Sequence, residues 1–169
     1  MNRMKGISLV ELLTTLSVAT IFFSVAMPTL SSIVHRSTLQ SSTGQLINGI
    51  ALTRQLAIQR GQAITMVNLD GAWNNGWNIF NDGNGNGLQD EDEPSIRTHP
   101  PLDRGVQVVA NRPVSQYIRY LPDGRAHLHS GGFQAGTIWI CHEKTDISAV
   151  RLTLNFGGRL RQSTSDCPN

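Results

Sequence analysis

The stretch that decides the fold lies near the start of the chain, where residues 5–13 read Lys5-Gly6-Ile7-Ser8-Leu9-Val10-Glu11-Leu12-Leu13. It opens a run of mostly apolar or small residues from Ile7 to Leu30, which as a helix would be about 36 Å long and could cross a bilayer. The basic residues Arg3 and Lys5 precede the run, and by the positive-inside rule they keep that end in the cytoplasm. We therefore expect one membrane-spanning helix, with the rest of the chain outside.

One charged side chain, Glu11, lies inside this apolar run. An unpaired carboxylate at that depth costs a few kcal/mol or more, so it needs a partner. The alternative to an anchor is an ordinary secretory signal, because Ser24-Val25-Ala26 has the small residues of a cleavage site. The carboxylate of Glu11 favours the anchor over the signal.

Residues 5–13 resemble the class III leader of type IV pilins and pseudopilins. The resemblance implies that prepilin peptidase cleaves between Gly6 and Ile7 and methylates the new amino group. It also implies that Glu11 pairs with the N-terminus of a neighbouring subunit during assembly. Ile7 stands where phenylalanine or methionine is usual, which leaves the extent of its methylation open. We expect residues 1–6 to form the leader and residues 7–30 the transmembrane and assembly helix.

The helical pattern continues beyond the apolar run. An apolar stripe recurs at spacings of three, four and seven residues, formed by Leu39, Leu46, Ile47, Ile50, Ala57 and Ile58. The stripe predicts that residues 31–61 continue the helix and pack on a sheet, with Gly61 as its stop. The segment 53–61 resembles the helix end of the FimT and FimU minor pilins and of the GspH pseudopilin.

Residues 62–169 alternate short β-prone runs with turn residues, which predicts antiparallel sheet. The runs are Ile64–Leu69, Trp77–Phe80, Val106–Val109, Tyr117–Leu121, Thr137–Cys141 and Val150–Phe156, with a last strand around Leu160. Turns are expected at Pro122-Asp123-Gly124 and Asn155-Phe156-Gly157-Gly158. One long helix followed by strands gives an α+β, type IV pilin-like fold, with the helix packed on the sheet. The resemblance to the FimT and GspH group covers nearly the whole chain.

Charge and cysteine content narrow the function classes. The formal net charge is +2, but loss of the leader with Arg3 and Lys5 leaves 12 basic and 12 acidic side chains. Nucleic acid would then have to bind to a local basic patch and not to the whole molecule. The two cysteines, Cys141 and Cys167, are expected to form a disulfide, because an anchored domain outside the cytoplasm folds in an oxidising compartment. The alternative is two unrelated buried thiols.

Residues 82–93 match the calcium-loop template D-x-[DN]-x-[DN]-G-x5-E. Oxygen donors stand at Asp82, Asn84, Asn86 and Glu93. A predicted strand enters this segment and Pro94 follows it, so the flanking helices of an EF-hand are not expected. A solvated hairpin tip is therefore the stronger expectation and a calcium ion the weaker one. No other cofactor is expected.

The C-terminal quarter carries the candidate basic patch. Arg159 and Arg161 stand at i and i+2 in the sequence Gly158-Arg159-Leu160-Arg161, a spacing that places both on one face of a strand. Guanidinium groups on one face suit successive phosphates of a nucleic-acid backbone. Solvated arginines, or pairs with Asp146 or Asp166, are the alternative. Lys144 and Arg151 are weaker candidates, recommended only by proximity in sequence.

The GRxR element resembles that of FimT proteins, which take part in DNA uptake for natural transformation. The resemblance implies a minor pilin in which Arg159 and Arg161 contact DNA phosphates without sequence preference. Its other partners would be pilin subunits, the inner membrane and prepilin peptidase, with the C-terminal domain in the periplasm or, in a pilus, outside the cell. The alternative is a structural minor pilin or GspH-like pseudopilin that primes fibre assembly. No catalytic motif is recognised, so we expect no enzyme.

Overall fold

The computed structural model describes residues 8–143 and 147–168, with the side chains of residues 23–30 outside the description. Its first element is a single helix, α1, at Leu9–Arg60. The chain divides into two compact units, with the boundary between Ser37 and Thr38. The second unit contains the last part of α1 and all of the strands.

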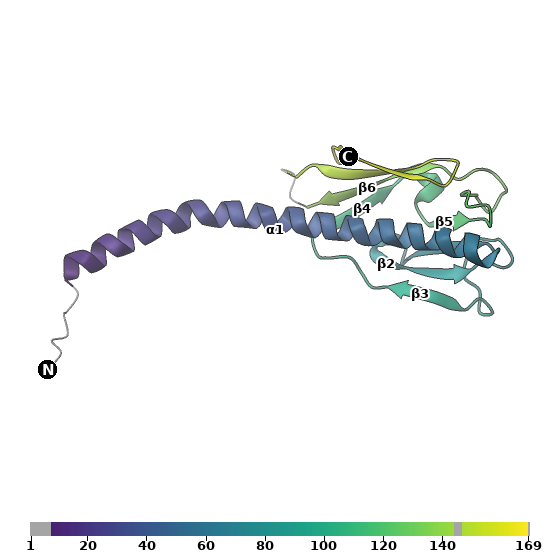
Figure 1. The fold of residues 1–169 in the computed structure, drawn as a ribbon, viewed down its shortest axis with the longest axis horizontal. Coiled ribbons are helices and arrows are strands. Elements are labelled where there is room, and N and C mark those ends of the chain that lie inside the picture. The colour runs from purple at the N-terminus through teal and green to yellow at the C-terminus, as the bar shows by residue number, and fades with distance from the viewer. Residues whose placement is uncertain (1–7, 144–146, 169) are drawn as a thin grey trace. The chain divides into compact units, whose positions relative to one another are not determined.

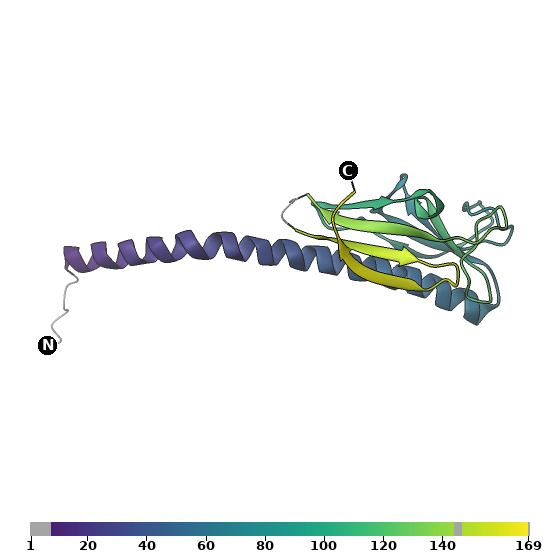
Figure 2. The ribbon, with the colours of Figure 1, turned by 90° about the horizontal axis from the view of Figure 1, so that it is seen from above.

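The second unit is built from two four-stranded antiparallel sheets, with strand orders β3-β2-β1-β5 and β4-β6-β7-β8. Figure 1 shows β2 and β3 on one side of α1 and β4 and β6 on the other, and Figure 2 shows the same elements from above. The strand bounds are β1 Ile64–Leu69, β2 Ala72–Asn81, β3 Ser95–His99, β4 Val106–Ala110, β5 Tyr117–Tyr120, β6 Gly136–His142, β7 Ala149–Leu154 and β8 Leu160–Ser165.

One face of α1 is buried in the core of this unit. The predicted stripe is confirmed at Leu39, Leu46, Ile50 and Ala57, which are all buried. The prediction is wrong for Ile58, whose residue surface is 50% exposed. The buried residues on this side are Leu39, Leu46, Ile50, Thr53 and Ala57, and their spacings of seven, four, three and four keep them on one face of a helix.

Two threonines complete the buried face of α1 where an apolar residue would be expected. The hydroxyl of Thr43 donates to the carbonyl of Leu39 at 2.7 Å, and that of Thr53 donates to the carbonyl of Gly49 at 2.8 Å. Each hydroxyl therefore enters the core with its hydrogen bond already made within the helix, which removes the cost of burying it.

A glycine lets the helix approach the first sheet closely. A Cβ atom at Gly49 would lie 2.7 Å from Nε1 of the buried Trp77 on β2. Glycine inside a helix costs about 1 kcal/mol relative to alanine. The packing of a large indole directly against the helix backbone offsets that cost.

Residues 62–169, called the β-domain below, contain every predicted strand and one strand that was not predicted. All seven expected strands are present, and Gly61 directly after α1 has a positive φ of 63°. The strand that the sequence pattern misses is β3, an edge strand that pairs with β2. It spans only five residues between Pro94 and Pro100, and its two β-branched side chains, Ile96 and Thr98, are too few to indicate a strand.

In the first unit, α1 exposes its large apolar side chains. Leu9, Val10, Leu12, Leu13, Leu16, Val18, Ile21 and Phe22 are all more than half exposed. Glu11 lies exposed in the first turn. Within the described residues, no helix combines the length and apolar character of a membrane span. The predicted span 7–30 includes Ile7 and the side chains of residues 23–30, which are outside the description, as are the predicted leader residues through Gly6.

The buried helical face can be tested with two isoleucines of the same helix. Replacing Ile50, 1% exposed, with alanine should lower the free energy of unfolding by about 2–4 kcal/mol, because a cavity is left in the core. Ile58→Ala removes the same atoms from a half-exposed position and should cost less than about 1 kcal/mol. Urea unfolding of residues 38–169 measures both. Equal losses would contradict the packing of α1 described here.

Candidate nucleic-acid interface on the C-terminal hairpin

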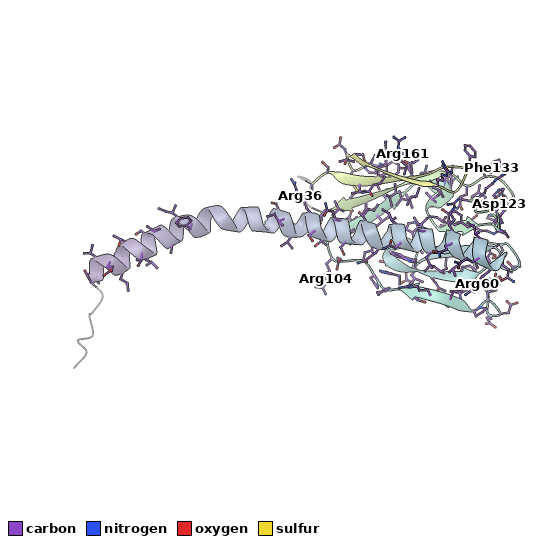
Figure 3. All side chains as sticks on the ribbon, in the orientation of Figure 1. Arg36, Arg60, Arg104, Asp123, Phe133 and Arg161 are labelled. Carbon is purple, nitrogen blue, oxygen red and sulfur yellow. A yellow bond between two sulfur atoms is a disulfide. The ribbon has the colours of Figure 1, made fainter. Side chains whose placement is uncertain are left out.

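The strands β7 and β8 place two arginines on the outer face of the second sheet. In the antiparallel register Arg161 lies opposite Thr153, and Arg151 lies opposite Ser163. The neighbouring positions Leu152 and Leu154 are buried in the core, so alternation turns Arg151 and Arg161 away from it. The two arginines are diagonal neighbours, a relation that places residues about 7–8 Å apart and their Cβ atoms somewhat closer. Figure 3 shows Arg161 on the outer side of the domain.

The strands that form this face contain no carboxylate. In the four strands β4, β6, β7 and β8, all within the described chain, there is no Asp or Glu, and Arg151 and Arg161 are the sole Lys or Arg residues. Among the residues that the structure describes, neither Arg159 nor Arg161 forms an ion pair. Asp166, a partner considered from the sequence, follows the far end of β8. The second alternative, Asp146, lies outside the described residues.

Arg159 is placed differently from the sequence expectation, because β8 begins one residue later, at Leu160. Its backbone closes the turn from β7: the amide of Arg159 donates to the side chain of Asn155 at 2.9 Å, and the amide of Asn155 donates to the carbonyl of Arg159 at 3.0 Å. The side chain of Arg159 is exposed. The predicted pair is thus split, with Arg159 at the corner of the hairpin and Arg161 on the strand.

Gly158 fixes this corner against the rest of the domain. A Cβ atom there would lie 2.2 Å from the carbonyl oxygen of Gly124 and 2.8 Å from the ring of Tyr120, and φ is 74°. The hydroxyl of Tyr120 donates to the carbonyl of Gly158 at 3.0 Å. Burial raises the pKa of the Tyr120 phenol well above its ordinary value, so the hydroxyl keeps the proton that it donates.

The same corner is tied to the end of α1. Nε of Arg54 donates to the carbonyl of Gly124 at 2.9 Å, and Gly124 in turn packs against Gly158. A groove of about 670 Å³ lies between the helix and the hairpin. Its lining includes Ile47, Ile50, Ile58, Leu160, Arg54 and Arg159. The local sequence did not indicate Tyr120 or Arg54 as supports of the site, because only the fold brings them to residue 158.

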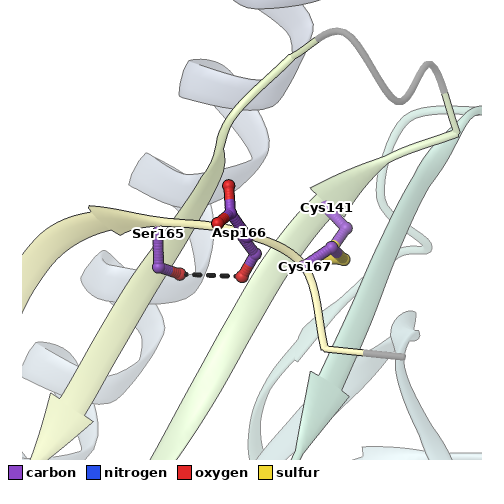
Figure 4. The surroundings of a disulfide bond; sticks show 4 residues. All are labelled: Cys141, Ser165, Asp166 and Cys167. Carbon is purple, nitrogen blue, oxygen red and sulfur yellow. Dashed lines mark hydrogen bonds between the residues drawn. A yellow bond between two sulfur atoms is a disulfide. The ribbon is translucent and has the colours of Figure 1, made fainter.

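The predicted disulfide is confirmed. Cys141 on β6 and Cys167 after β8 are bonded, with Cα atoms 6.0 Å apart (Figure 4). Ser165, near this link, donates a hydrogen bond to the carbonyl of Asp166. In the loop-closure model, a link across 26 residues contributes about 3.5 kcal/mol. It holds the end of β8, an edge strand, to β6 across the intervening β7. Lys144, a weaker candidate, lies outside the described residues.

The predicted calcium loop has internal partners for its carboxylates. Oδ2 of the fully buried Asp82 lies 2.9 Å from Nε of Arg119, and it accepts a hydrogen bond from the hydroxyl of Thr65 at 2.8 Å. The Arg119 N–H is not aligned on the oxygen, so that contact is an ion pair and not a hydrogen bond. Glu93 accepts from the amide of Gly83 at 2.8 Å.

Metal binding by this loop therefore stays a sequence prediction. Asn84 and Asn86, the other predicted donors, each donate their side-chain amide to Asp90, at 2.7 and 2.8 Å. Among the described residues, no three side chains of His, Cys, Asp or Glu are grouped so as to hold a metal ion. The loop's five carboxylates belong to the first sheet's β2–β3 connection and not to the arginine face.

Gly158 can be tested against its neighbour. Gly158→Ala should lower the free energy of unfolding by about 2–3 kcal/mol, because the methyl group meets fixed backbone and a positive φ is strained. Gly157→Ala is the matched control: its nearest neighbour would be 3.4 Å away and its φ is not positive, so we expect a change within about 0.5 kcal/mol. Similar stabilities in urea would show that the corner is not packed as described.

Asp82 can be tested against an exposed carboxylate of the same loop. Asp82→Asn should destabilise by about 2–3 kcal/mol in the presence of a chelator, because Arg119, 13% exposed at its side chain, loses its counter-charge. Asp92→Asn, at an exposed position, should have little effect. Thermal unfolding measures both. A calcium-induced rise in the wild-type midpoint that Asp82→Asn abolishes would support the predicted metal site.

The chain is similar to a known protein family and to solved structures. The family model described as "Type II transport protein GspH" matches residues 42–158, more than half of the chain. The type IV minor pilin FimU of Pseudomonas aeruginosa is similar in structure, with 20% identity and a TM-score of 0.61, over 78% of this chain and 92% of FimU. A second crystal form of FimU gives 20% identity and a TM-score of 0.58, over 73% and 91%.

The minor pseudopilin EpsH from the type 2 secretion system of Vibrio cholerae has 19% identity and a TM-score of 0.46, over 79% of this chain and 95% of EpsH. The comparison with curated protein sequences found no match. The FimU likeness confirms the predicted pilin-like fold. Family membership implies a membrane-anchored subunit that assembles with other pilin subunits. The matched region contains most of the β-domain, and the chain belongs to the GspH-like family of type IV minor pilins and pseudopilins.

Proposed function

We propose that the chain is a minor type IV pilin that binds extracellular DNA through Arg159 and Arg161 during uptake for natural transformation. The observation that carries the proposal is the outer face of the second sheet, whose strands hold the exposed Arg151 and Arg161 and no carboxylate, with the exposed Arg159 at the adjoining turn. The resemblance of Gly158-Arg159-Leu160-Arg161 to the GRxR element of FimT supports the same function.

The arrangement suits the phosphate backbone. Arg159 at the turn and Arg161 on β8 are exposed, without ion-pair partners among the described residues, and Arg151 lies diagonal to Arg161. Guanidinium groups form charge-assisted bonds with phosphate oxygens, and such contacts carry no sequence information. Nε of Arg151 already donates to the hydroxyl of Ser163 at 3.2 Å, so Arg151 would be a secondary contact. Binding should therefore be non-specific and should weaken steeply with salt.

The N-terminal part of the chain supplies the anchor in this proposal. Residues 7–30 would hold the protein in the inner membrane after prepilin peptidase has cut behind Gly6, with the domain in the periplasm. The exposed apolar side chains between Leu9 and Phe22 call for lipid or helix partners. In a fibre, Glu11 would pair with the N-terminus of a neighbouring subunit, and assembly would carry the domain outside the cell.

A second candidate is a structural subunit without a role in DNA binding. It is favoured by the match of residues 42–158 to a type II transport family, which suggests a pseudopilin that primes fibre assembly. In that case Glu11 and α1 would matter and Arg159 would not. Transformation, piliation and protein-secretion assays of Arg159 variants separate the candidates, because loss of transformation with normal fibres and secretion favours DNA capture.

The DNA proposal is tested by the double variant Arg159→Gln, Arg161→Gln. Full chain in neutral detergent should lose gel-shift binding of duplex DNA at moderate salt, and the slope of log affinity against log salt should fall by about 2, one unit for each lost phosphate contact. Unfolding should be unchanged, since both side chains are exposed.

The matched control is the double variant Arg97→Gln, Arg104→Gln. It removes the same charge from exposed positions outside the second sheet, on β3 and in the loop before β4. Figure 3 shows Arg104 well separated from Arg161. Its DNA affinity should stay within about twofold of wild type. Equal losses in the two double variants would point to total charge and would remove the assignment to the hairpin.

A further inference from the structure

Two exposed phenylalanines contact each other at the hairpin formed by β7 and β8, which carries Arg159 and Arg161. Phe156 lies in the turn between β7 and β8 and is 66% exposed, and Phe133 lies in the loop before β6 and is 56% exposed. Their ring centroids are 6.2 Å apart in an edge-on arrangement with an interplanar angle of 66°. Figure 3 shows Phe133 at the end of the domain. We call Phe133 and Phe156 the aromatic platform.

The platform is held in place by its surroundings. Phe133 forms an antiparallel bridge with His127, and the two rings are 5.0 Å apart. Phe156 is carried by the turn that Gly158 and Asn155 fix through the contacts described above. The rings therefore stay exposed because rigid backbone presents them, and burial in the core would require this turn to move.

The charge next to the platform selects the class of partner. Phe156 stands three residues before Arg159 on the same turn, and Arg161 follows on the strand. An apolar protein surface would leave these guanidinium groups without counter-charge. Exposed aromatic faces beside cations are the combination that single-stranded nucleic acids require, since bases stack on the rings while phosphates meet the cations.

We propose that the aromatic platform stacks an unpaired base, so that this site binds single-stranded DNA in preference to duplex. The inference rests on the proposed DNA-binding function and adds the form of DNA that the site takes. In a duplex both faces of an interior base are already stacked, so the platform would have nothing to bind. Phosphate contacts are available in both forms, which leaves duplex binding to the arginines alone.

The two rings should contribute unequally. Phe133 is approached by His127 on one side and by Phe156 on another, whereas Phe156 is the more exposed ring. Phe156 is therefore the stacking ring, and Phe133 supports its position. Losing Phe156 should weaken single-strand binding more than losing Phe133.

The experiment compares a single-stranded oligonucleotide with the duplex of the same length, using the full chain in neutral detergent and fluorescence anisotropy. Phe156→Leu keeps an apolar side chain and removes the π face. It should weaken single-strand binding about tenfold or more and leave duplex binding within about twofold. Phe156→Trp keeps a π face and should bind the single strand about as tightly as the wild type does. Leu88→Ala is the control, because Leu88 is an exposed apolar residue of the predicted calcium loop. It should change neither single-strand nor duplex binding.

Each outcome decides the matter. Unchanged single-strand affinity in Phe156→Leu, with duplex binding that still depends on Arg159 and Arg161, would overturn the platform and leave the proposed function standing. Wild type that binds neither form would overturn both. Normal DNA binding by Phe156→Leu, together with reduced incorporation of this variant into fibres, would overturn base stacking and assign the rings to a contact between subunits.

Discussion

Burial of one face of α1 against two sheets is the constraint on which the β-domain depends. Leu46 and Ile50 enter a core shared with Met66 from the first sheet and with Ile138 and Leu152 from the second. Each sheet has one apolar face to cover, and in the second unit the helix covers both. The helix therefore links the two sheets through one core, and Arg151 and Arg161 lie on the side of the second sheet that is turned away from it.

The C-terminal hairpin shows how this constraint reaches the proposed DNA-binding surface. Arg54 on α1 holds the carbonyl of Gly124, and Gly124 packs against Gly158, whose carbonyl accepts the Tyr120 hydroxyl. The disulfide between Cys141 and Cys167 holds the other end of β8. An edge strand fixed at both ends can present charged side chains in a defined geometry, which matters for contacts with a regular phosphate backbone.

Charge segregation within the domain has a structural cause. The predicted calcium loop is bound to the first sheet, because Asp82 pairs with Arg119 on β5 and Glu93 accepts a hydrogen bond from the amide of Gly83. The carboxylates of this loop are thereby kept on the first sheet. The strands of the second sheet contain two arginines and no Asp, Glu or Lys. A chain with a formal net charge of only +2 can then offer a basic surface, since local fields depend on the distribution of charge and not on its sum.

Periodicity and turn residues were enough to predict the fold class, the helix and seven of the eight strands, because these features depend on local preferences. The disulfide was predicted from the even number of cysteines and from the expected oxidising compartment. The edge strand β3 gave too little signal, and Ile58 shows that an apolar residue next to the buried stripe can stay half exposed. Arg159 and Arg161 could be selected by spacing. Their separation into corner and strand, the brace at Gly158 and the meeting of Phe133 with Phe156 were decided by tertiary structure, because each joins segments whose proximity only the packed core determines.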